Sequence, residues 1–466
     1  MVGSVNSYTL QRVIQDHSDT FRQDSFSLAS STAPDGIDSL DVDKNTFKQI
    51  FQDHWETFKA TYPRFDTPDY DTAVLKMLDC GDPEKMGYVQ YRCLHCGETR
   101  RIAFTCKSSF CLSCAQPRMS QWADFIGRRL FPGVTYRHFI LTTPKFLRHW
   151  FYLCPDLLSE LMRRGHACLE DIFRTTTGKP LDIGCVMVLQ TFGRSGEFNP
   201  HLHILVTAGG LTAKGKWRNV SFIPYDMMHR KWQYHLLDLL RQEVDDPHVQ
   251  QDIDRGWKNY PKGFVAHLQP GDVPPGGKGL AEYLAKYVVS PPISVRRLEE
   301  YDGQQVRYWY EDHKTQAIEH VTLPVLRFMG RMVQHILPKG FQRIRYFGLH
   351  SNPRYQQVRE QLTTVLPGGG SSDPRGCRVL PRPQFAQLFL DTFGQEPLLC
   401  PRCGTPMDWE YLCHPKYGIL KEAQLFQDEP PDGQIESQAP GVASGDAGQD
   451  SLATSFALVQ LLLPFM

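Results

Sequence analysis

Two histidines open an apolar run in the stretch FNPHLHILVTAGGL, residues 198–211. His201 and His203 are one residue apart, directly after an Asn-Pro turn signal. Side chains alternate between the two faces of a β-strand, so both imidazoles share one face of the strand that this run predicts. The pair is therefore a candidate metal site, although two histidines spaced in this way on a strand are more often an ordinary exposed pair.

The preceding apolar run, IGCVMVLQTFG, predicts a partner strand that turns back through residues 193–200. If Phe192 pairs with His201, the antiparallel register places Gln190 opposite His203 and on the same face as both histidines. Gln190 is then a third side chain able to bind a metal. A slip of one residue in this register would remove it from the group.

Two tyrosines follow in a short predicted helix, LAEYLAKYVV, residues 280–289. Tyr283 and Tyr287 are four residues apart, so they lie on one face of the helix about one turn from each other. The same face carries the apolar residues Leu280, Leu284 and Val288. Two interpretations are open at this point. The tyrosines either pack on a buried face of the helix, or their phenol groups belong to the same site as the histidines.

The thirteen cysteines separate into clusters and isolated residues. Four of them form two Cys-x-x-Cys knuckles separated by fourteen residues: Cys93, Cys96, Cys111 and Cys114. Two such knuckles can surround one tetrahedral zinc ion. Nothing in the sequence indicates secretion, so disulfides are the weaker explanation. Cys80 and Cys106 lie close enough to support a second ion or another ligand set, and the spacing leaves that choice open.

A second cysteine pattern, CPRCGTPMDWEYLCH, lies toward the C-terminus. It offers Cys400 and Cys403, followed by Cys413 or His414 after nine or ten intervening residues. The pattern lacks a clean second pair. It predicts a second zinc site, and the alternative is a turn that happens to contain cysteines.

The formal net charge is zero, with 51 basic and 51 acidic residues, but the charge is unevenly distributed. The ends are acidic, since residues 1–50 hold seven Asp against four Lys/Arg and residues 416–466 hold seven acids against two Lys. Residues 92–129 hold seven Lys/Arg against two acids, and residues 320–354 hold six Lys/Arg and no acid. These two segments predict binding to a polyanion, and solvated charged faces are the alternative.

The order of these features resembles the insertion sequence 91 family of two-tyrosine HUH rolling-circle transposases, which carry an N-terminal transposase zinc-binding domain. The resemblance covers roughly residues 47–415. Its most specific pieces are NPHLHILVTAGGL, YLAKYVVSPPIS and HILPKGFQRIRYFG. The zinc spacing alone would fit many proteins.

The resemblance implies a nuclease site in which His201 and His203 bind Mg²⁺ or Mn²⁺, with Gln190 as the candidate third ligand. It implies that Tyr283 and Tyr287 attack single-stranded DNA and form 5′-phosphotyrosine intermediates, whereas the Zn²⁺ ions are structural. Two imidazoles are an unusual choice for such hard cations, so the spacing alone does not identify the metal.

The implied partners are single-stranded DNA, the hairpin ends of the mobile element and target DNA, in the bacterial cytoplasm at the nucleoid. The basic segment 320–354 mixes positive charge with aromatic residues, which suits single strands. Its candidate DNA contacts are Arg331, Lys339, Arg343 and Arg345. The alternatives are a plasmid replication initiator or relaxase of the same HUH class, and a non-enzymatic zinc-finger regulator that would bind DNA without forming a covalent adduct.

We expect an α+β fold, with an HUH-endonuclease core of antiparallel sheet and flanking helices after a cysteine-rich zinc module. The expected divisions are a disordered tail (1–45), a helical and zinc-binding DNA-binding domain (46–132), a catalytic domain (133–365), a linker with a zinc-knuckle-like segment (366–415) and an acidic disordered tail (416–466). No apolar run reaches the ~20 residues needed to span a bilayer, so no membrane partner is expected.

Overall fold

The structure is a computed structural model that describes residues 45–269, 284–285, 287–288, 290–312, 315–366 and 398–423, except for the side chains of residues 115–121 and 124. The chain divides into two compact units. The core unit comprises residues 1–70 and 122–377, and the cysteine-rich unit comprises residues 71–121 and 378–466. Most of the expected N-terminal tail, linker and C-terminal tail lies outside the described residues.

These units differ from the expected domain limits. Helix α2 (Thr46–Thr61), which we expected in the zinc-binding domain, belongs to the core unit, where Phe47 lies against Phe328 of α11 (Val325–Val333) at a ring-centroid distance of 6.4 Å. At the other end, strand β14 (Gly418–Glu422) continues past residue 415, where the disordered tail was expected to begin. Both of these domain limits are set by packing between segments that are distant in sequence.

The core unit is built on a five-stranded antiparallel sheet. Its strands, in the spatial order β12-β4-β5-β3-β8, are β12 (Ile344–Gly348), β4 (Gly184–Phe192), β5 (Phe198–Thr207), β3 (Tyr136–Thr142) and β8 (Ala266–Leu268). The apolar runs at residues 183–193 and 198–211, which the sequence marks as strands, contain β4 and β5. Every residue of β4 is buried, so both faces of the sheet must be covered.

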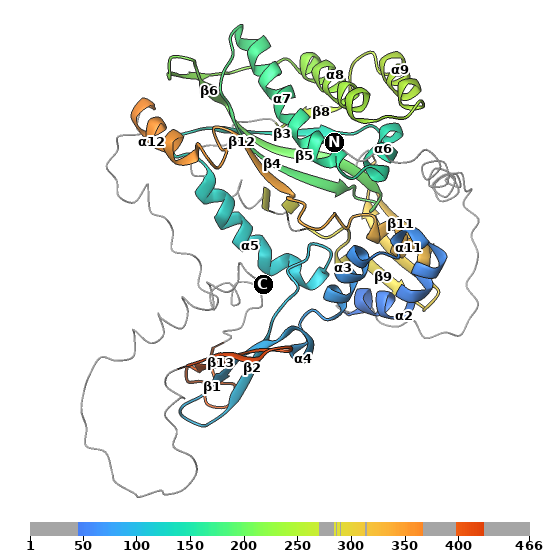
Figure 1. Cartoon of the computed structure of the whole chain (residues 1–466), viewed down its shortest axis with the longest axis vertical. Coiled ribbons are helices and arrows are strands. Elements are labelled where there is room, and N and C mark those ends of the chain that lie inside the picture. The colour runs from blue at the N-terminus through green and yellow to red at the C-terminus, as the bar shows by residue number, and fades with distance from the viewer. Residues whose placement is uncertain are drawn as a thin grey trace, which may run out of the picture. The chain divides into compact units, whose positions relative to one another are not determined.

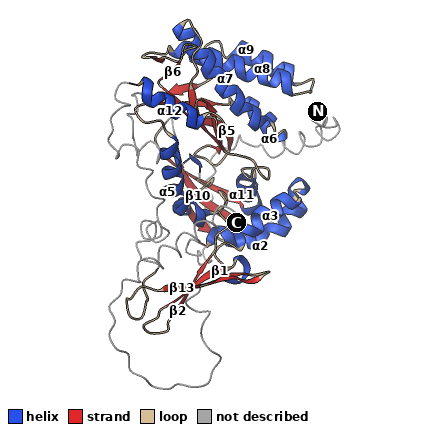
Figure 2. Ribbon diagram, turned by 60° about the vertical axis from the view of Figure 1, so that its left-hand side comes forward, coloured by secondary structure: helices blue, strands red, loops and turns tan. Residues whose placement is uncertain are grey.

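One face of this sheet is covered by helices (Figures 1 and 2). They are α6 (Arg148–Leu153), α7 (Leu157–Thr177), α8 (Tyr225–Glu243) and α9 (Val249–Asn259). Helices α6 and α7 are separated near Pro155, where the missing amide hydrogen favours a break. Helix α7 lies close to β5, because a Cβ on Gly165 would come within 2.6 Å of Leu202.

The opposite face carries the smaller apolar residues Val186, Val188 and Leu205. The described part of the predicted tyrosine helix, residues 284, 285, 287 and 288, is helical and packs on this face through Leu284 and Val288. Helix α12 (Tyr355–Val365) and the end of α5 (Leu112–Arg129) contribute to the same cluster. This is the face of β5 to which His201 and His203 belong.

A smaller three-stranded sheet, in the order β11-β10-β9, completes the core unit. Its strands are β9 (Leu298–Tyr301), β10 (Gln305–Glu311) and β11 (Ile318–Pro324). Helices α2 and α11 pack against it through aromatic residues spaced at helical period in α2, as the sequence predicts. Tyr301 and Tyr308 are fully buried in this region, where burial raises the pKa of both phenols.

The cysteine-rich unit contains a four-stranded antiparallel sheet in the order β14-β13-β1-β2. The strands other than β14 are β1 (Tyr88–Arg92), β2 (Thr99–Ala103) and β13 (Asp408–His414). The short helix α4 (Pro83–Met86) precedes β1 and is capped by Asp82, whose carboxylate accepts a hydrogen bond from the Glu84 amide at 2.9 Å. Strands from the two ends of the described chain thus form one sheet.

The remaining helix and short strands are α3 (Pro68–Leu78), β6 (Gly209–Leu211) and β7 (Trp217–Asn219).

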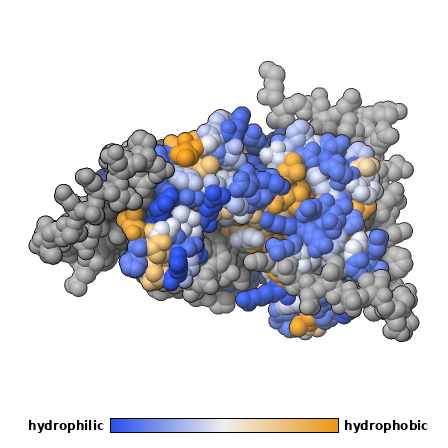
Figure 3. All heavy atoms as spheres, turned by 90° about the horizontal axis from the view of Figure 1, so that it is seen from below, coloured by the Kyte–Doolittle hydropathy of each residue, from blue (hydrophilic) through white to orange (hydrophobic). Residues whose placement is uncertain are grey.

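The expected α+β architecture with antiparallel sheets is confirmed. None of the described helices combines the length and apolar character that crossing a membrane would require. On the face seen in Figure 3, hydrophilic residues cover most of the described surface and hydrophobic ones form small separate patches.

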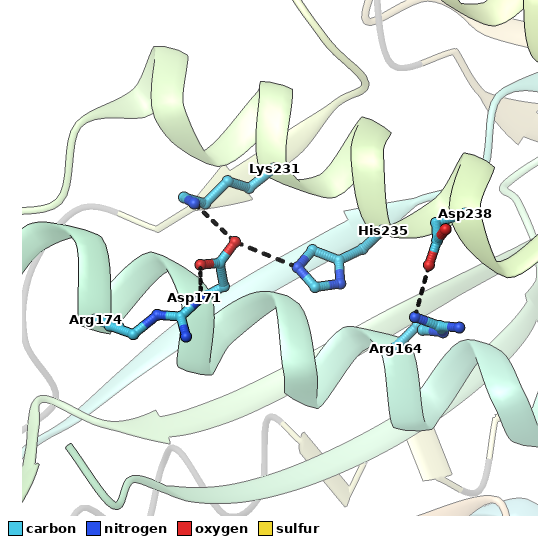
Figure 4. A network of polar contacts seen from close by, with 6 residues as sticks. All are labelled: Arg164, Asp171, Arg174, Lys231, His235 and Asp238. Carbon is cyan, nitrogen blue, oxygen red and sulfur yellow. Dashed lines mark hydrogen bonds and ion pairs between the residues drawn. The ribbon is translucent and has the colours of Figure 1, made fainter. Parts of the chain in front are cut away.

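Helices α7 and α8 are joined by a polar network at their interface. Figure 4 shows its members: Arg164, Asp171, Arg174, Lys231, His235 and Asp238. Asp171 lies 2.7 Å from Lys231 and 2.8 Å from Arg174. Burial opposes ionisation of this carboxyl, but the hydrogen bonds from Lys231 and Arg174 outweigh it and lower the pKa of Asp171 to about 2. The network therefore favours the ionised carboxylate in the folded state.

Replacing Asp171 with Asn should lower the free energy of unfolding by about 1–2 kcal/mol at pH 7, because a charge-assisted interaction is lost. The folded-state pKa lies below the unfolded value of ~4, so the stabilisation is complete above that value and fades as pH falls toward about 2. Urea unfolding between pH 7 and pH 3 should show the difference from wild type shrinking. The exposed Asp245→Asn control should show almost no difference, and an equal loss at every pH would contradict the ionic origin.

Candidate functional site

The histidine pair lies on β5 with both side chains on the face opposite the helices. The pairing of β4 with β5 places Gln190 opposite His201 and Val188 opposite His203. The sequence-based register, in which Phe192 pairs with His201 and Gln190 with His203, is therefore wrong by two residues. Because side chains alternate with a period of two, Gln190 nevertheless stays on the histidine face.

The shift has a local cause at the hairpin turn. Strand β5 starts at Phe198, which pairs directly with Phe192, so the turn comprises only residues 193–197 and is closed by the hydrogen bond from the Gly193 amide to the Glu197 carbonyl at 3.1 Å. The register then changes before Gln190 meets His201, because β5 has one extra residue in the Asn199-Pro200 region. The turn therefore ends before Asn199 and Pro200, which the sequence predicted to lie inside it.

Hydrogen bonds fix the orientation of both imidazoles. His201 donates from Nδ1 to the backbone oxygen of Asn199 at 2.7 Å, which leaves its Nε2 as the lone-pair nitrogen of a neutral ring. The Nδ1 of His203 lies 3.2 Å from Nε2 of His138 on the neighbouring strand β3. Within the part of the chain that the structure describes, Nε2 of His203 is buried and has no hydrogen-bond partner.

His138 occupies one nitrogen of His203, because its Nε2 lies within hydrogen-bond distance of His203 Nδ1 and one of these two nitrogens donates to the other. His201 likewise makes its hydrogen bond through Nδ1. Both β5 histidines thus use Nδ1 for contacts within the fold and leave Nε2 for a ligand, as metal-binding imidazoles commonly do.

Burial keeps these rings neutral. It lowers the pKa of His201 to about 4, with the Asn199 hydrogen bond opposing the shift and the charge of Arg148 adding to it. It lowers the pKa of His203 well below the usual value, and the neighbouring His201 and His138 add to the effect. Neutral imidazoles are the form that binds a cation, so no proton has to be displaced at neutral pH.

Tyr287 reaches this face from the short helix. Its ring stacks on His203 with a centroid distance of 3.6 Å and an angle of 15° between the planes. Tyr287 is half-buried, whereas its neighbours Leu284 and Val288 are buried in the core. Tyr287 also packs against the apolar cluster of this face, so it contacts both the stripe and the histidine. Tyr283, the other predicted nucleophile, lies outside the described residues.

The site thus brings together two imidazoles, one amide side chain and one phenol. In the described ranges, no third His, Cys, Asp or Glu completes a ligand group with His201 and His203. Gln190, opposite His201, is the side chain that the register offers for a third position. A metal held by two nitrogens and one amide oxygen would keep positions open for phosphate oxygens.

Sequence reasoning missed two residues of this site. His138 contacts His203 only because β3 pairs with β5, and no local pattern reports that pairing. Arg148, in α6, acts on His201 through its charge, and burial lowers the pKa of its own guanidinium. The strand YRHFILT could have pointed to His138, a polar residue within a buried strand, but not to its partner.

The four candidate DNA contacts have different neighbours. Lys339 is exposed in the turn before β12, and Arg343 reaches the backbone oxygen of Val288 at 3.4 Å. Arg345 donates to the Ser159 hydroxyl of α7 at 2.7 Å, and Arg331 donates to the Tyr308 hydroxyl at 2.6 Å. Among the aromatic residues of this segment Phe328 is buried, and three others are half-buried against the two core clusters: Phe341, Tyr346 and Phe347.

Arg331 lines a hollow beside the β4–β5 turn. The volume of the hollow is about 600 Å³ when the space open to solvent is counted. Arg64 and Arg327 also line the hollow, with Phe58 and Tyr62 on its apolar side and Glu197 as the acidic member. The Arg64 guanidinium lies 4.6 Å from the ring of Phe65, and its Nε and Nη1 atoms are buried without a hydrogen-bond partner in the described structure. Three guanidinium groups against one carboxylate give the hollow positive charge.

The cysteines of the other unit form two groups of four, and in each group the sulfur atoms all lie within 4.8 Å of one another. One group contains Cys80, Cys106, Cys111 and Cys114. The other contains Cys93, Cys96, Cys400 and Cys403. Of the ligand sets that the spacing left open, the structure brings Cys80 and Cys106 to the second knuckle rather than the first knuckle to the second. The first knuckle instead meets the C-terminal one, because β1 pairs with β13.

Cys413, expected as a ligand beside Cys400 and Cys403, lies outside both groups, in β13 and paired with Tyr88. The pKa shifts within the second group differ in sign. Hydrogen bonds from Thr405 lower the pKa of Cys403 to about 5 and also lower that of Cys93. The backbone hydrogen bond from Glu98 lowers the pKa of Cys96, but burial and the neighbouring thiols outweigh this effect and raise that pKa to about 12.

Comparison with known families defines the class of protein. Residues 50–143 match the family described as "Transposase zinc-binding domain", and residues 184–357 match the family described as "Putative transposase". The first match contains the cysteines from Cys80 to Cys114, and the second contains His201, His203 and Tyr287. The chain thus combines a zinc-binding domain with a transposase domain.

Similarity to curated proteins agrees with this class. The chain is 31% identical over 352 residues to the "Transposase for insertion sequence element IS801" of Pseudomonas savastanoi pv. phaseolicola, covering 72% of this chain and 82% of the relative. It is 26% identical over 374 residues to the "Putative transposase y4qJ" of Sinorhizobium fredii (strain NBRC 101917 / NGR234), covering 76% and 92%. No solved structure matches the chain. The chain belongs to the insertion sequence 91 family of transposases, with an N-terminal zinc-binding domain.

Proposed function

We propose that this transposase moves its insertion sequence by a rolling-circle mechanism, in which single-stranded DNA is cleaved and rejoined through 5′-phosphotyrosine intermediates. The observation that carries the proposal is the stack of Tyr287 on His203, at 3.6 Å, on a buried sheet face where both histidines offer Nε2. Membership of the family favours this activity over the replication initiator, the relaxase and the non-enzymatic regulator. The substrate is DNA, so we place the protein in the bacterial cytoplasm at the nucleoid.

The donor set fits a divalent cation. His201 and His203 would hold the cation through Nε2, with Gln190 as third ligand. The cation would give a partner to Nε2 of His203, which is buried and has no hydrogen-bond partner among the described residues. We assign Mg²⁺ or Mn²⁺, for which an amide oxygen and phosphate oxygens are suitable additional ligands. When bound, the ion would draw electron density from the scissile phosphate and neutralise charge that develops on it.

The residues of the chain carry the chemistry itself. A phenolic oxygen forms a bond to phosphorus, the bond from phosphorus to the 3′ oxygen breaks, and that oxygen takes up a proton as a free 3′-hydroxyl. The phosphotyrosine keeps the energy of the phosphodiester, so a new 3′-hydroxyl can reverse the step without ATP. Tyr287 is one nucleophile, and Tyr283, one helical turn earlier, is proposed as the second, for the other end of the element.

We propose that the DNA partners are single strands and the hairpin ends of the element, together with target DNA. The hollow at Arg331 provides positive charge beside the half-buried ring of Tyr62, whereas Phe58 is buried behind it. Glu197 lines the hollow and His201 follows it by four residues, which corresponds to roughly 13 Å along an extended strand. A strand bound in this hollow would therefore lie within a few nucleotides of the histidines.

The nucleophile assignment predicts a covalent adduct. Single-stranded DNA of the element terminus, incubated with the protein and Mg²⁺ or Mn²⁺, should give a protein–DNA species that survives denaturant and is linked through a tyrosine oxygen. Tyr287→Phe and Tyr283→Phe should each lose at least one step of transposition, and the double variant should form no adduct. Phe keeps the ring that stacks on His203, so the melting temperature should stay close to wild type.

The control is Tyr234→Phe, because Tyr234 is exposed on α8, on the helix side of the sheet, and belongs to neither the histidine site nor the hollow at Arg331. It should retain the adduct. Undiminished adduct in the double variant would dismiss both Tyr283 and Tyr287 as nucleophiles.

The metal assignment predicts that His201→Ala and His203→Ala abolish cleavage while DNA binding falls by less than about threefold. Gln190→Ala should raise the metal concentration needed for half-maximal cleavage about 10–100-fold, as loss of a ligand or supporting group does. Cleavage assays across a Mn²⁺ titration, with binding measured in parallel by fluorescence anisotropy, separate these effects. Cleavage that persists in excess chelator would refute the assignment.

The DNA-contact assignment predicts that Arg331→Gln weakens binding to single-stranded DNA about tenfold and reduces the slope of log affinity against log salt by about 0.7. The matched control is Arg163→Gln, which removes the same charge from an exposed position on α7 that does not line the hollow and should leave both quantities unchanged. The readout is a salt titration of affinity with each variant. An equal loss of affinity in the two variants would show that Arg331 acts only through the net charge of the protein, and would contradict its assignment as a DNA contact.

A further inference from the structure

Two cysteine knuckles from opposite ends of the described chain have the same backbone conformation. In CLHCGE the amide of Gly97 donates to the Cys93 carbonyl at 2.9 Å, and in CPRCGT the amide of Gly404 donates to the Cys400 carbonyl at 2.9 Å. Both glycines have positive φ, +73° and +72°, a conformation that other residues rarely adopt. The third knuckle, CLSCAQ at Cys111, has alanine at that position and differs in type.

The sulfur atoms of the two matching knuckles converge. Sγ of Cys93 lies 3.5 Å from Sγ of Cys403, and Sγ of Cys96 lies 3.5 Å from Sγ of Cys400. In a tetrahedral zinc site with Zn–S bonds of about 2.3 Å, neighbouring sulfurs are about 3.7 Å apart. The Thr405 hydroxyl lies within 3.1 Å of both Cys93 and Cys403, as a supporting group around thiolate ligands does.

The strands behind the knuckles hold them in this position. Strand β13 pairs with β1 from Tyr88 to Arg92, and the two segments share a hydrophobic core in which Val89 and Tyr91 meet Met407 and Trp409. The ligand pairs are therefore brought together by a packed sheet rather than by the metal alone.

A buried carboxylate fixes the register of this sheet. Glu410 of β13 accepts hydrogen bonds from Gln90 at 2.9 Å and from Arg92 at 2.8 Å, both on β1. Glu410 is buried, and a shift of the strand would leave its charge without these donors at a cost of several kcal/mol. The position of the C-terminal knuckle against the first knuckle is thus specific.

We propose that Cys93, Cys96, Cys400 and Cys403 bind a structural zinc ion that clasps the C-terminal segment, residues 398–423, to the β1–β2 hairpin. The family matches end at residues 143 and 357, so neither of them contains Cys400 or Cys403. The zinc-binding domain of this chain is discontinuous, because a segment that follows the transposase domain in sequence supplies half of one ligand set. The clasp is independent of the cleavage chemistry proposed above.

The second ion has a different role from the first. The group of Cys80, Cys106, Cys111 and Cys114 lies entirely within residues 80–114, so its zinc stabilises a local loop. Loss of the clasp zinc should release the C-terminal segment and leave the local site intact. Zinc counts and ligand pairing, rather than transposition, therefore test the proposal.

Zinc stoichiometry of the purified full-length chain, measured by inductively coupled plasma mass spectrometry, is the first test. Wild type should contain two zinc ions per chain. The variant Cys400→Ser/Cys403→Ser should contain one, and Cys413→Ser, which lies in the same segment but outside both groups, should contain two. Two ions in the Cys400→Ser/Cys403→Ser variant would overturn the clasp.

Combining knuckle variants tests which pairs share an ion. Removing Cys93/Cys96 together with Cys400/Cys403 should still leave one zinc, because both pairs belong to one site. Removing Cys93/Cys96 together with Cys111/Cys114 should leave none, because each pair belongs to a different site. The reverse result would restore the pairing that sequence spacing suggests and overturn the clasp.

A measurement on wild-type protein covers the case in which a variant does not fold. After zinc is removed by a chelator, mild oxidation with diamide converts two neighbouring thiols to a disulfide, and peptide mapping identifies the partners. The clasp predicts cross-links between Cys93 or Cys96 and Cys400 or Cys403. Cross-links of Cys93 or Cys96 only to Cys111 or Cys114 would overturn it.

Discussion

The histidine site depends on one constraint, the pairing of β5 with a strand on each side and with packing on both faces. Apart from Asn199, every residue of β5 is buried, so its alternation has to satisfy two different environments. Leu202 and Ile204 meet the helices, while His201 and His203 meet the face covered by the tyrosine helix. A register slip of one residue would place imidazoles in the helix core and leucines at the site. Hydrophobic packing on one face thus fixes the polar groups on the other.

Burying imidazoles in this way is tolerable only because they are neutral and hydrogen-bonded. His201 bonds to the backbone of Asn199, and His203 bonds to His138. These contacts use one nitrogen of each β5 histidine and leave Nε2 available. Among the described residues Nε2 of His203 is buried without a hydrogen-bond partner, a cost in free energy that a bound ligand would remove.

Local patterns in the sequence predicted the local parts of this arrangement. Period-two alternation gave β4 and β5 and the shared face of His201 and His203, and helical spacing gave α2. Features set by pairing between distant segments were not accessible, because no local pattern reports them. The register at Gln190 was wrong by two residues, and His138 was missed. The spacing also left the ligand set of Cys93 open, although the glycine that follows Cys96 and Cys403 but not Cys114 was a usable signal.

The cysteine-rich unit shows how such long-range pairing is stabilised. Cys93 and Cys403 are 310 residues apart, so the chain between them must be ordered or looped before the sheet of β1 and β13 can close. The entropic cost of closing a loop rises only by about 0.6 kcal/mol for each doubling of its length, so a few specific interactions are sufficient to offset it. The shared apolar core, the buried Glu410 contacts and a zinc ion supply them together. The transposase domain lies between the two halves in sequence, so the zinc-binding domain can be completed only after that domain has been synthesised.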